Sequence, residues 1–305
     1  MISDLNIQIR RYLEPVKARA VRFRCVNEKP VEVVLPTLRG VWGLALHQTN
    51  QKLYDTVFEG KNKTNQKQPL YIIRPDLNCN YENSQTFSFE WIVWNAAALQ
   101  YFDQLLQSWK LAGLLGLGKN RVRFNIIGAE PIFATESRTE TITNDTTSNF
   151  TDLPVFSPAE LQWTFGNHVR QLAFPHSIRL LQKGKLMTKP TLWNIIIAIF
   201  CRLSSMIVQG LGNIPSNRPS DDWMPCSQDI LELIRTIPNQ WQGETVTLRR
   251  YSARQQQEVD MNGVFGSLFV EKLPDEIKPL ILAADLFHLG KGTIMGLGRL
   301  LPITS

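Results

Sequence analysis

One order of secondary structure, β-α-β-β-α-β, is expected twice in this chain and constrains its fold more than any other feature. In the first half, period-two apolar alternation predicts strands, and apolar spacings of three and four predict helices. The expected elements are a strand at 16–26, a helix at 38–55 after the breaker Pro36, strands at 69–74 and 86–94, a helix at 96–111 and a strand at 122–127.

The same order returns in the second half. Its expected elements are strand material at 161–182, an apolar helix at 190–208, an extra short helix at 228–236, strands at 245–252 and 264–270, a helix at 275–287 and a short last strand. Each half matches the split βαβ unit, in which four antiparallel strands form one sheet and two helices cover one face. Because a repeated element order is hard to obtain by chance, we expect an α+β chain of two tandem ferredoxin-like (RRM-like) domains with a C-terminal glycine-rich loop.

Composition suggests where the two domains meet. Residues 136–157 are rich in Thr, Asn, Ser and Asp and poor in apolar residues, which is typical of a linker or an extended hairpin. The expected domains are therefore 1–135 and 158–305, and the glycine-rich loop of the second domain spans 288–299.

That loop contains Gly290, Gly292, Gly296 and Gly298 together with Lys291. Glycine permits positive φ and close approach of another backbone. Successive N–H groups in such a loop can face an anion, to which lysine adds a full charge. The alternative is a glycine that ends the preceding helix, followed by an ordinary tight loop, and composition leaves both interpretations open.

Other cofactor patterns fail on inspection. The run from Gly113 to Asn120 resembles a phosphate-binding P-loop, but Asn120 stands where Ser or Thr would bind magnesium, and a strand is expected after it instead of a helix. The carboxylates form no metal-binding motif, so we expect neither a metal nor another cofactor.

Charge and cysteine content narrow the class of protein. The net charge of +6 permits a nucleic-acid partner without demanding one. The four cysteines are far apart with no C-x-x-C spacing, which argues against a disulfide framework and fits a reducing cytoplasm. The start of the chain lacks the apolar region of a secretory signal. The apolar run 192–208 contains Asn194 and Arg202 and is too short to span a membrane, so we expect a core helix and no membrane partner.

Three segments of the second half carry a resemblance to a known family. They are Arg-Tyr-Ser-Ala-Arg-Gln at 250–255, Gly-Val-Phe-Gly at 263–266, and the run 287–299 with Phe-His-Leu-Gly-Lys-Gly-Thr and Gly-Leu-Gly-Arg. Together they resemble the C-terminal signature of the CRISPR precursor-RNA-processing endoribonucleases, the "Cas-six" branch of the RAMP superfamily.

The resemblance implies an antiviral-defence enzyme that binds CRISPR repeat RNA and cuts precursor crRNA. Cleavage would proceed by metal-independent attack of the 2′-hydroxyl, would leave a 2′,3′-cyclic phosphate and a 5′-hydroxyl, and would be followed by product retention. The implied partners are CRISPR repeat RNA or crRNA and, in a guide-RNA effector complex, other Cas proteins.

His47 is the candidate catalytic residue. It lies on the first expected helix but off its apolar stripe, on the side that also carries Gly40 and Gly43. A face without bulk would let a phosphate backbone approach. The plain alternative is a surface histidine on an amphipathic helix. Members of the resembled family usually place a catalytic histidine on or near this helix, which favours His47.

The helpers of His47 are less defined. Tyr54 lies two turns further along nearly the same face of the expected helix, and Lys52 would reach only through its long stem. Some family members use a Tyr, His and Lys set. Arg250, Tyr251 and Arg254 are alternative charge donors. His288, at the mouth of the glycine loop, is expected to shape that loop.

Basic residues and loop glycines mark the expected RNA contacts. Lys183-Gly184-Lys185 is typical of a hairpin tip, and in the resembled family the equivalent region often grips the repeat hairpin. The expected RNA-binding residues are Lys183, Lys185, Lys189, Arg249, Arg250, Arg254, Gly290, Lys291, Gly292, Gly296, Gly298 and Arg299. For each basic cluster the alternative is a solvated face.

Two other functions stay open at this point. One is a non-catalytic RAMP-type subunit that binds crRNA in a CRISPR effector complex. The other is a small-molecule enzyme that uses its glycine loops for a nucleotide.

Overall fold

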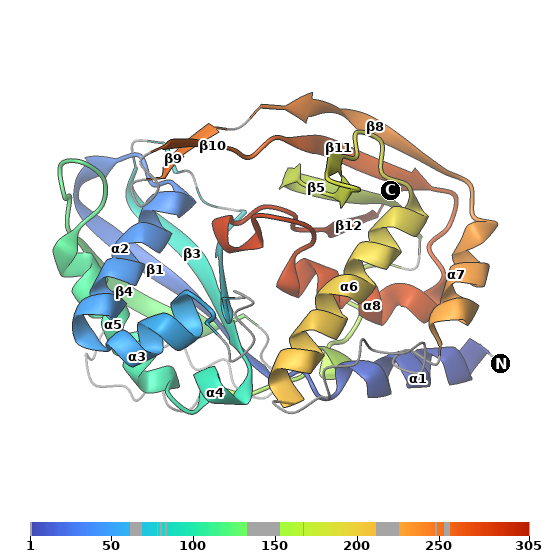
Figure 1. The fold of residues 1–305 in the computed structure, drawn as a ribbon, viewed down its shortest axis with the longest axis horizontal. Helices are drawn as coiled ribbons and strands as arrows, with labels where there is room; N and C mark the ends of the chain where they lie inside the picture. The colour runs from blue at the N-terminus through green and yellow to red at the C-terminus, as the bar shows by residue number, and fades with distance from the viewer. Residues whose placement is uncertain are drawn as a thin grey trace. The chain divides into compact units, whose positions relative to one another are not determined.

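The computed structural model describes residues 2–61, 69–77, 79, 81–82, 84–132, 153–166, 168–211, 226–247, 249–252 and 257–304 (Figure 1). The chain divides into two compact units, which are described separately below. One unit is Lys17–Phe156, and the other combines Met1–Val16 with Ser157–Ser305.

The unit Lys17–Phe156 contains a four-stranded antiparallel sheet in the order β2-β3-β1-β4. Its strands are β1 (Ala18–Val31), β2 (Tyr71–Pro75), β3 (Ser84–Trp94) and β4 (Phe124–Pro131). Its helices are α2 (Leu35–Thr49), α3 (Gln51–Leu53), a π-helical turn at Tyr54–Phe58, α4 (Ala96–Leu99) and α5 (Phe102–Leu115). This strand order is that of the ferredoxin-like unit, as expected.

Aromatic side chains fill the space between this sheet and its helices. Trp42 of α2 stacks on Trp109 of α5, with ring centroids 5.3 Å apart and planes at 8°. The indole N–H of Trp42 donates to Ser108 Oγ at 2.8 Å, so the buried polar atom is satisfied. Phe23 and Phe89 of the sheet lie 5.9 Å and 4.8 Å from the Trp109 ring. This packing fixes the position of α2, and therefore the position of His47 on its exposed face.

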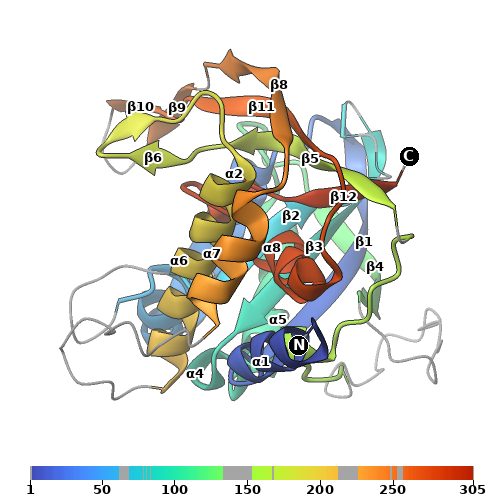
Figure 2. The ribbon, with the colours of Figure 1, turned by 90° about the vertical axis from the view of Figure 1, so that its right-hand side faces the viewer.

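The second unit contains another four-stranded antiparallel sheet, in the order β12-β5-β11-β8 (Figure 2). Its strands are β5 (Val169–Ile178), β8 (Asn239–Val246), β11 (Gly263–Val270) and β12 (Leu301–Thr304). Counted along the chain, these strands repeat the order of the first sheet, so the expectation of two ferredoxin-like sheets is confirmed. Two hairpins accompany the sheet, β6 (Leu181–Gln182) with β7 (Lys185–Leu186) and β9 (Arg249–Ser252) with β10 (Gln257–Asp260).

Beyond Ser157, the α-helices of this unit are α6 (Leu192–Leu211), α7 (Ser227–Arg235) and α8 (Lys278–Phe287), and α6 and α7 lie side by side (Figure 2). Leu192, Ile195 and Ile199 of α6 are buried, as expected for a core helix. Arg202, the charged residue of this apolar helix, donates from Nε to the Phe287 carbonyl at 3.2 Å. Burial lowers the pKa of Arg202 to about 10. Among the described helices, none is long and apolar enough to cross a membrane.

The first helix, α1 (Ile2–Leu13), corrects the expected domain boundaries. It belongs with Ser157–Ser305, although the sequence had placed residues 1–135 in one domain. Ile9 and Leu13 are buried, and Ser157 Oγ donates to the Leu13 carbonyl at 3.0 Å. The expected linker at 136–157 falls largely outside the described residues, which resume at residue 153.

Candidate functional site

His47 lies in the last turn of α2. Leu38, Val41, Trp42 and Ala45 of this helix are buried, whereas His47 is exposed. The expectation that the imidazole lies off the apolar stripe is therefore confirmed. Pro36, taken as a breaker, instead lies inside the first turn of the helix, where its missing N–H has no intrahelical acceptor to lose.

The expected continuous helix over 38–55 is wrong, because the chain breaks at Asn50. This residue adopts an extended conformation (φ −155°, ψ 93°), and its side chain accepts a hydrogen bond from the Leu53 N–H at 3.1 Å. Asparagine is a preferred N-cap, so it starts the new turn α3. A π-helical turn, Tyr54–Phe58, follows directly.

The break brings Tyr54 onto His47. The two ring centroids are 4.9 Å apart and the ring planes meet at 85°, an edge-to-face contact. The sequence had paired these residues by counting seven positions along one helix. The pairing exists, but it results from a change of direction at Asn50 and a wider π turn, which often accompanies functional sites.

Two further aromatic side chains, Phe58 and Tyr71, continue the ring contacts of Tyr54. Tyr54 stacks on Phe58 with centroids 5.0 Å apart and planes at 17°, and Phe58 stacks on Tyr71 at 5.4 Å. The guanidinium carbon of Arg39 lies 4.2 Å from the Phe58 centroid, a cation–π geometry.

The expectation that Gly40 and Gly43 leave an open face on α2 is wrong at Gly43, because the Phe58 ring lies there. A Cβ added at Gly43 would lie 2.3 Å from Phe58 Cζ, so the ring occupies the space that glycine leaves. Gly40, one turn earlier, has nothing within 4 Å of such a Cβ. Only Gly40 therefore keeps the unobstructed surface that the sequence suggested for both positions.

Three polar residues that the sequence did not single out, Asp55, Glu59 and Lys61, lie near the two rings. The Tyr54 hydroxyl donates to Glu59 Oε1 at 3.3 Å, and Lys61 Nζ lies 2.5 Å from Asp55 Oδ1. The hydrogen bond from Lys61 lowers the pKa of Asp55, and the nearby charge of His47 acts in the same direction. Asp55, Glu59 and Lys61 follow Tyr54 within seven positions, which the sequence shows. The contacts themselves, Tyr54 with Glu59 and Lys61 with Asp55, depend on the π-helical turn and could not be read from spacing.

Lys52, expected to help His47, is exposed on α3 and makes no hydrogen bond or ion pair with another described residue. Lys61 carries the positive charge that the structure places in the same cluster as Asp55. The arrangement offers an accessible imidazole, a neighbouring phenol and a lysine, which are the groups that proton transfer and charge stabilisation at a phosphodiester require.

The glycine-rich loop 288–299 is a tightly bonded backbone structure in the other unit. Gly290, Gly292, Gly296 and Gly298 all have φ between 77° and 81°. Leu289 N–H donates to the Gly298 carbonyl at 2.8 Å, and Gly298 N–H donates to the Ser177 carbonyl at 3.0 Å. The glycines thus serve at least to form the loop, which supports the plainer of the two sequence interpretations without excluding ligand contact by Lys291.

His288 has the role in loop shape that the sequence suggested. It is fully buried, has φ 55°, and its Nδ1 lies 3.0 Å from the Leu297 carbonyl oxygen.

Arg299, in contrast, differs from the expectation of an RNA contact. Its side chain is 9% exposed, and Nε lies 2.8 Å from Asp285 Oδ1. A buried arginine needs such a partner, so Arg299 serves the packing of the unit.

The remaining expected RNA contacts divide by position. Lys183, Lys185, Lys189 and Lys291 are exposed. Lys183 and Gly184 have positive φ, 50° and 79°, at the tip of the β6–β7 hairpin, which confirms the predicted tip. Arg249 and Arg250 lie on β9, and Arg254 falls outside the described residues.

No group of three His, Cys, Asp or Glu side chains within the described ranges has a metal-binding arrangement. The run resembling a P-loop ends α5, makes a tight turn through the Leu117–Val122 bridge and enters β4. The strand expected after it is confirmed, so the motif lacks the helix on which a P-loop depends.

Comparison with solved structures identifies the architecture. A Cas6 product complex aligns with a TM-score of 0.55 at 14% identity, over 94% of this chain and 99% of that chain. The chain has the Cas6 fold. A Thermus thermophilus Cas6 aligns equally well, with a TM-score of 0.55 at 13% identity over 94% of this chain and 99% of that one.

The Cas6 fold also occurs inside longer chains. A partial Cas6-RT-Cas1–Cas2 complex aligns with a TM-score of 0.54 at 13% identity, over 95% of this chain and 46% of that chain. The AF_1859_N family model, described as an N-terminal domain, matches residues 19–155, which nearly coincide with the unit Lys17–Phe156. No curated protein matches the chain significantly in sequence.

Proposed function

We propose that this protein is an endoribonuclease that binds CRISPR repeat RNA and cleaves precursor crRNA by attack of a 2′-hydroxyl on the adjacent phosphate. His47 exchanges the proton in this reaction, and no metal is required. The observation that carries the proposal is the exposed His47 imidazole held edge-to-face against Tyr54 at 4.9 Å in a Cas6 fold.

The groups around His47 suit each part of this reaction. An imidazole titrates near neutral pH and can take or return a proton. The Tyr54 hydroxyl, already a donor to Glu59, is the candidate second proton-transfer group. Lys61 and Lys52 are candidates for stabilising the charge that grows on the phosphate oxygens in the transition state.

The partner is CRISPR repeat RNA, with Lys183, Lys185, Lys189 and Lys291 as exposed phosphate contacts. Support comes from the similar folds, one of which is a Cas6 product complex and another a part of a Cas6-RT-Cas1–Cas2 complex. We extend both to this chain, which would retain its cleaved RNA and assemble with other Cas proteins.

The test is single-turnover cleavage of a CRISPR-repeat transcript in EDTA. His47→Ala should lower the cleavage rate about 10²- to 10⁴-fold, the usual contribution of a positioned acid or base, and should leave repeat binding unchanged. The control is Gln48→Ala, an exposed neighbour on the same helix, which should cleave like the wild type. The wild-type product should carry a 2′,3′-cyclic phosphate.

Two results would contradict the proposal. Cleavage by His47→Ala at the wild-type rate would remove His47 from the mechanism. A wild-type protein that binds repeat RNA tightly and never cuts it would instead be a non-catalytic crRNA-binding subunit.

A further inference from the structure

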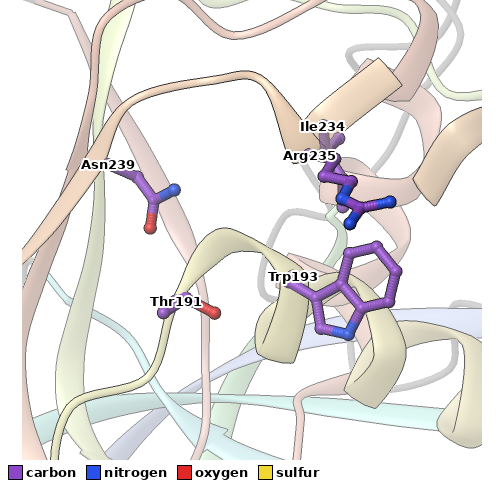
Figure 3. A pocket seen from close by; sticks show the side chains of 5 residues that line it. All are labelled: Thr191, Trp193, Ile234, Arg235 and Asn239. Carbon is purple, nitrogen blue, oxygen red and sulfur yellow. The ribbon is translucent and has the colours of Figure 1, made fainter. Parts of the chain in front are cut away.

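An open pocket of about 520 Å³ lies in the second unit, remote in sequence from His47. It forms where α6 begins, α7 ends and β8 begins, and it is lined by Thr191, Trp193, Ile234, Arg235 and Asn239 (Figure 3). Its volume is within the range of sites that hold one small ligand. None of the expected RNA-binding residues lines it.

Trp193 gives the pocket a stacking surface. Its side chain is 41% exposed, although neighbouring residues of α6, such as Leu192 and Ile195, are fully buried. Ile234, 2% exposed, adds a buried apolar residue to the lining. A large exposed indole next to an apolar wall can take the face of a planar ring, because π-faces stack and both surfaces leave water.

The charge of the pocket is positive. Arg235 is exposed and forms no ion pair with any residue that the structure describes. No carboxylate is among the five lining residues. Lys189, two positions before Thr191, is also exposed. In Figure 3 the guanidinium of Arg235 lies beside Trp193, on the same side of the opening. A ligand with a ring for Trp193 and an anionic group for Arg235 fits this pair.

Two polar side chains hold fixed positions on the other side of the opening (Figure 3). Asn239 accepts from the Leu192 N–H at 3.1 Å and donates to the Ile237 carbonyl at 2.9 Å. These bonds orient its amide, and each end of an amide can make another hydrogen bond. Thr191 Oγ1 is likewise fixed, 2.7 Å from Asn194 Oδ1. An oriented amide suits the edge of a nucleobase.

We propose that this pocket binds one unpaired nucleotide of the RNA, with the base on Trp193, the phosphate at Arg235 and the base edge at Asn239. The inference rests on the proposed RNA-binding function. It concerns a single-stranded part of the RNA, because bases in an A-form stem are stacked on each other and only unpaired bases can leave to stack on a protein ring.

The test compares two RNAs, the repeat hairpin with single-stranded flanks and the same hairpin trimmed to its stem and loop. Trp193→Ala should weaken binding of the flanked RNA about 5- to 150-fold, the usual effect of losing one base–aromatic stack. Binding of the trimmed RNA should not change. Trp193→Phe, which keeps a stacking ring, should recover most of the affinity.

Arg235→Gln should lower the slope of log affinity against log salt by about one for the flanked RNA only, since one phosphate contact is lost. The matched controls are Phe265→Ala, which removes an equally exposed aromatic residue, and Arg170→Gln, which removes an exposed arginine; neither residue lines the pocket. Both controls should bind the two RNAs like the wild type.

The outcomes separate the pocket from the proposed function. A wild-type protein that binds neither RNA overturns the proposed function itself. A wild type that binds both, with pocket variants that match it on the flanked RNA, overturns only the pocket. The same holds if Trp193→Ala weakens both RNAs equally, or if the variants lose a protein partner and keep their RNA affinity.

Discussion

Replacing Gly43 with alanine tests the packing on which the candidate site depends. The added Cβ would lie 2.3 Å from Phe58 Cζ and 2.6 Å from Cε2, so the ring must move. Overpacking of this kind costs about 1–3 kcal/mol, whereas alanine in place of a helical glycine gains up to about 1 kcal/mol. We therefore expect Gly43→Ala to lower the free energy of unfolding by roughly 1–2 kcal/mol.

Gly40→Ala provides the matched control on the same helix. Because nothing lies within 4 Å of a Cβ at this position, only the helix-propensity gain remains. Gly40→Ala should stabilise the protein by about 0.5–1 kcal/mol. Urea or guanidinium midpoints measure both effects, so the two glycines should give shifts of opposite sign.

Phe58→Ala identifies the cause of the Gly43 effect. This truncation should itself cost about 3–5 kcal/mol, and in its background Gly43→Ala should become stabilising, because the clashing ring is gone. Since Phe58 supports Tyr54 at a centroid distance of 5.0 Å, Gly43→Ala should also slow RNA cleavage more than it weakens binding. Equal stabilisation by Gly40→Ala and Gly43→Ala in the wild-type background would refute this reasoning.

Three further predictions concern other contacts. Tyr54→Phe, which keeps the ring against His47 and loses the hydroxyl that donates to Glu59, should slow single-turnover cleavage about 10²- to 10⁴-fold; cleavage at the wild-type rate would remove the hydroxyl from the mechanism. Arg299→Met removes the cation of a largely buried ion pair with Asp285 and should lower the free energy of unfolding by about 3–5 kcal/mol, a result that a wild-type denaturation midpoint would contradict. Burial, with Arg299 nearby, lowers the pKa of His176 below its ordinary 6.5. The His176 imidazole therefore binds a proton more readily in the unfolded chain than in the folded one. The contribution of neutral His176 to stability should accordingly be lost as pH falls below about 6.5. Between about pH 7.5 and pH 5.5, the denaturation midpoint of His176→Gln should therefore fall less than that of the wild type. An equal fall in both proteins would contradict this role of His176.

The sequence predicted most of the elements because their apolar periods are strong. The alternation along β1 and the apolar run of α6 each led to the observed element within a few residues. The two ferredoxin-like sheets followed from element order alone. Strand β8 begins at Asn239, earlier than the expected 245, because its exposed, polar first residues lack the alternation that marks a half-buried strand.

The candidate site was harder to predict because it depends on contacts that periodicity does not encode. Asn50 is a residue type that favours helix N-caps, but the helical apolar pattern continues past it, so the sequence predicted one helix where the structure has a break. The space that Gly43 leaves is taken by Phe58, fifteen positions later, and no spacing rule on one helix shows this. The burial of Arg299 likewise follows from its pairing with Asp285 in the preceding helix, whereas in sequence it looks like another surface charge beside a glycine loop.

The place of α1 has a consequence for how the chain is made. The ribosome releases this helix before Ser157–Ser305, the segment with which it packs and buries Ile9 and Leu13. Lys17–Phe156 can therefore collapse while translation continues, whereas Met1–Val16 must wait, with its apolar side uncovered, until the rest has left the exit tunnel. Deleting α1 would accordingly damage the last part of the chain to fold, because this helix packs against residues translated more than a hundred codons later.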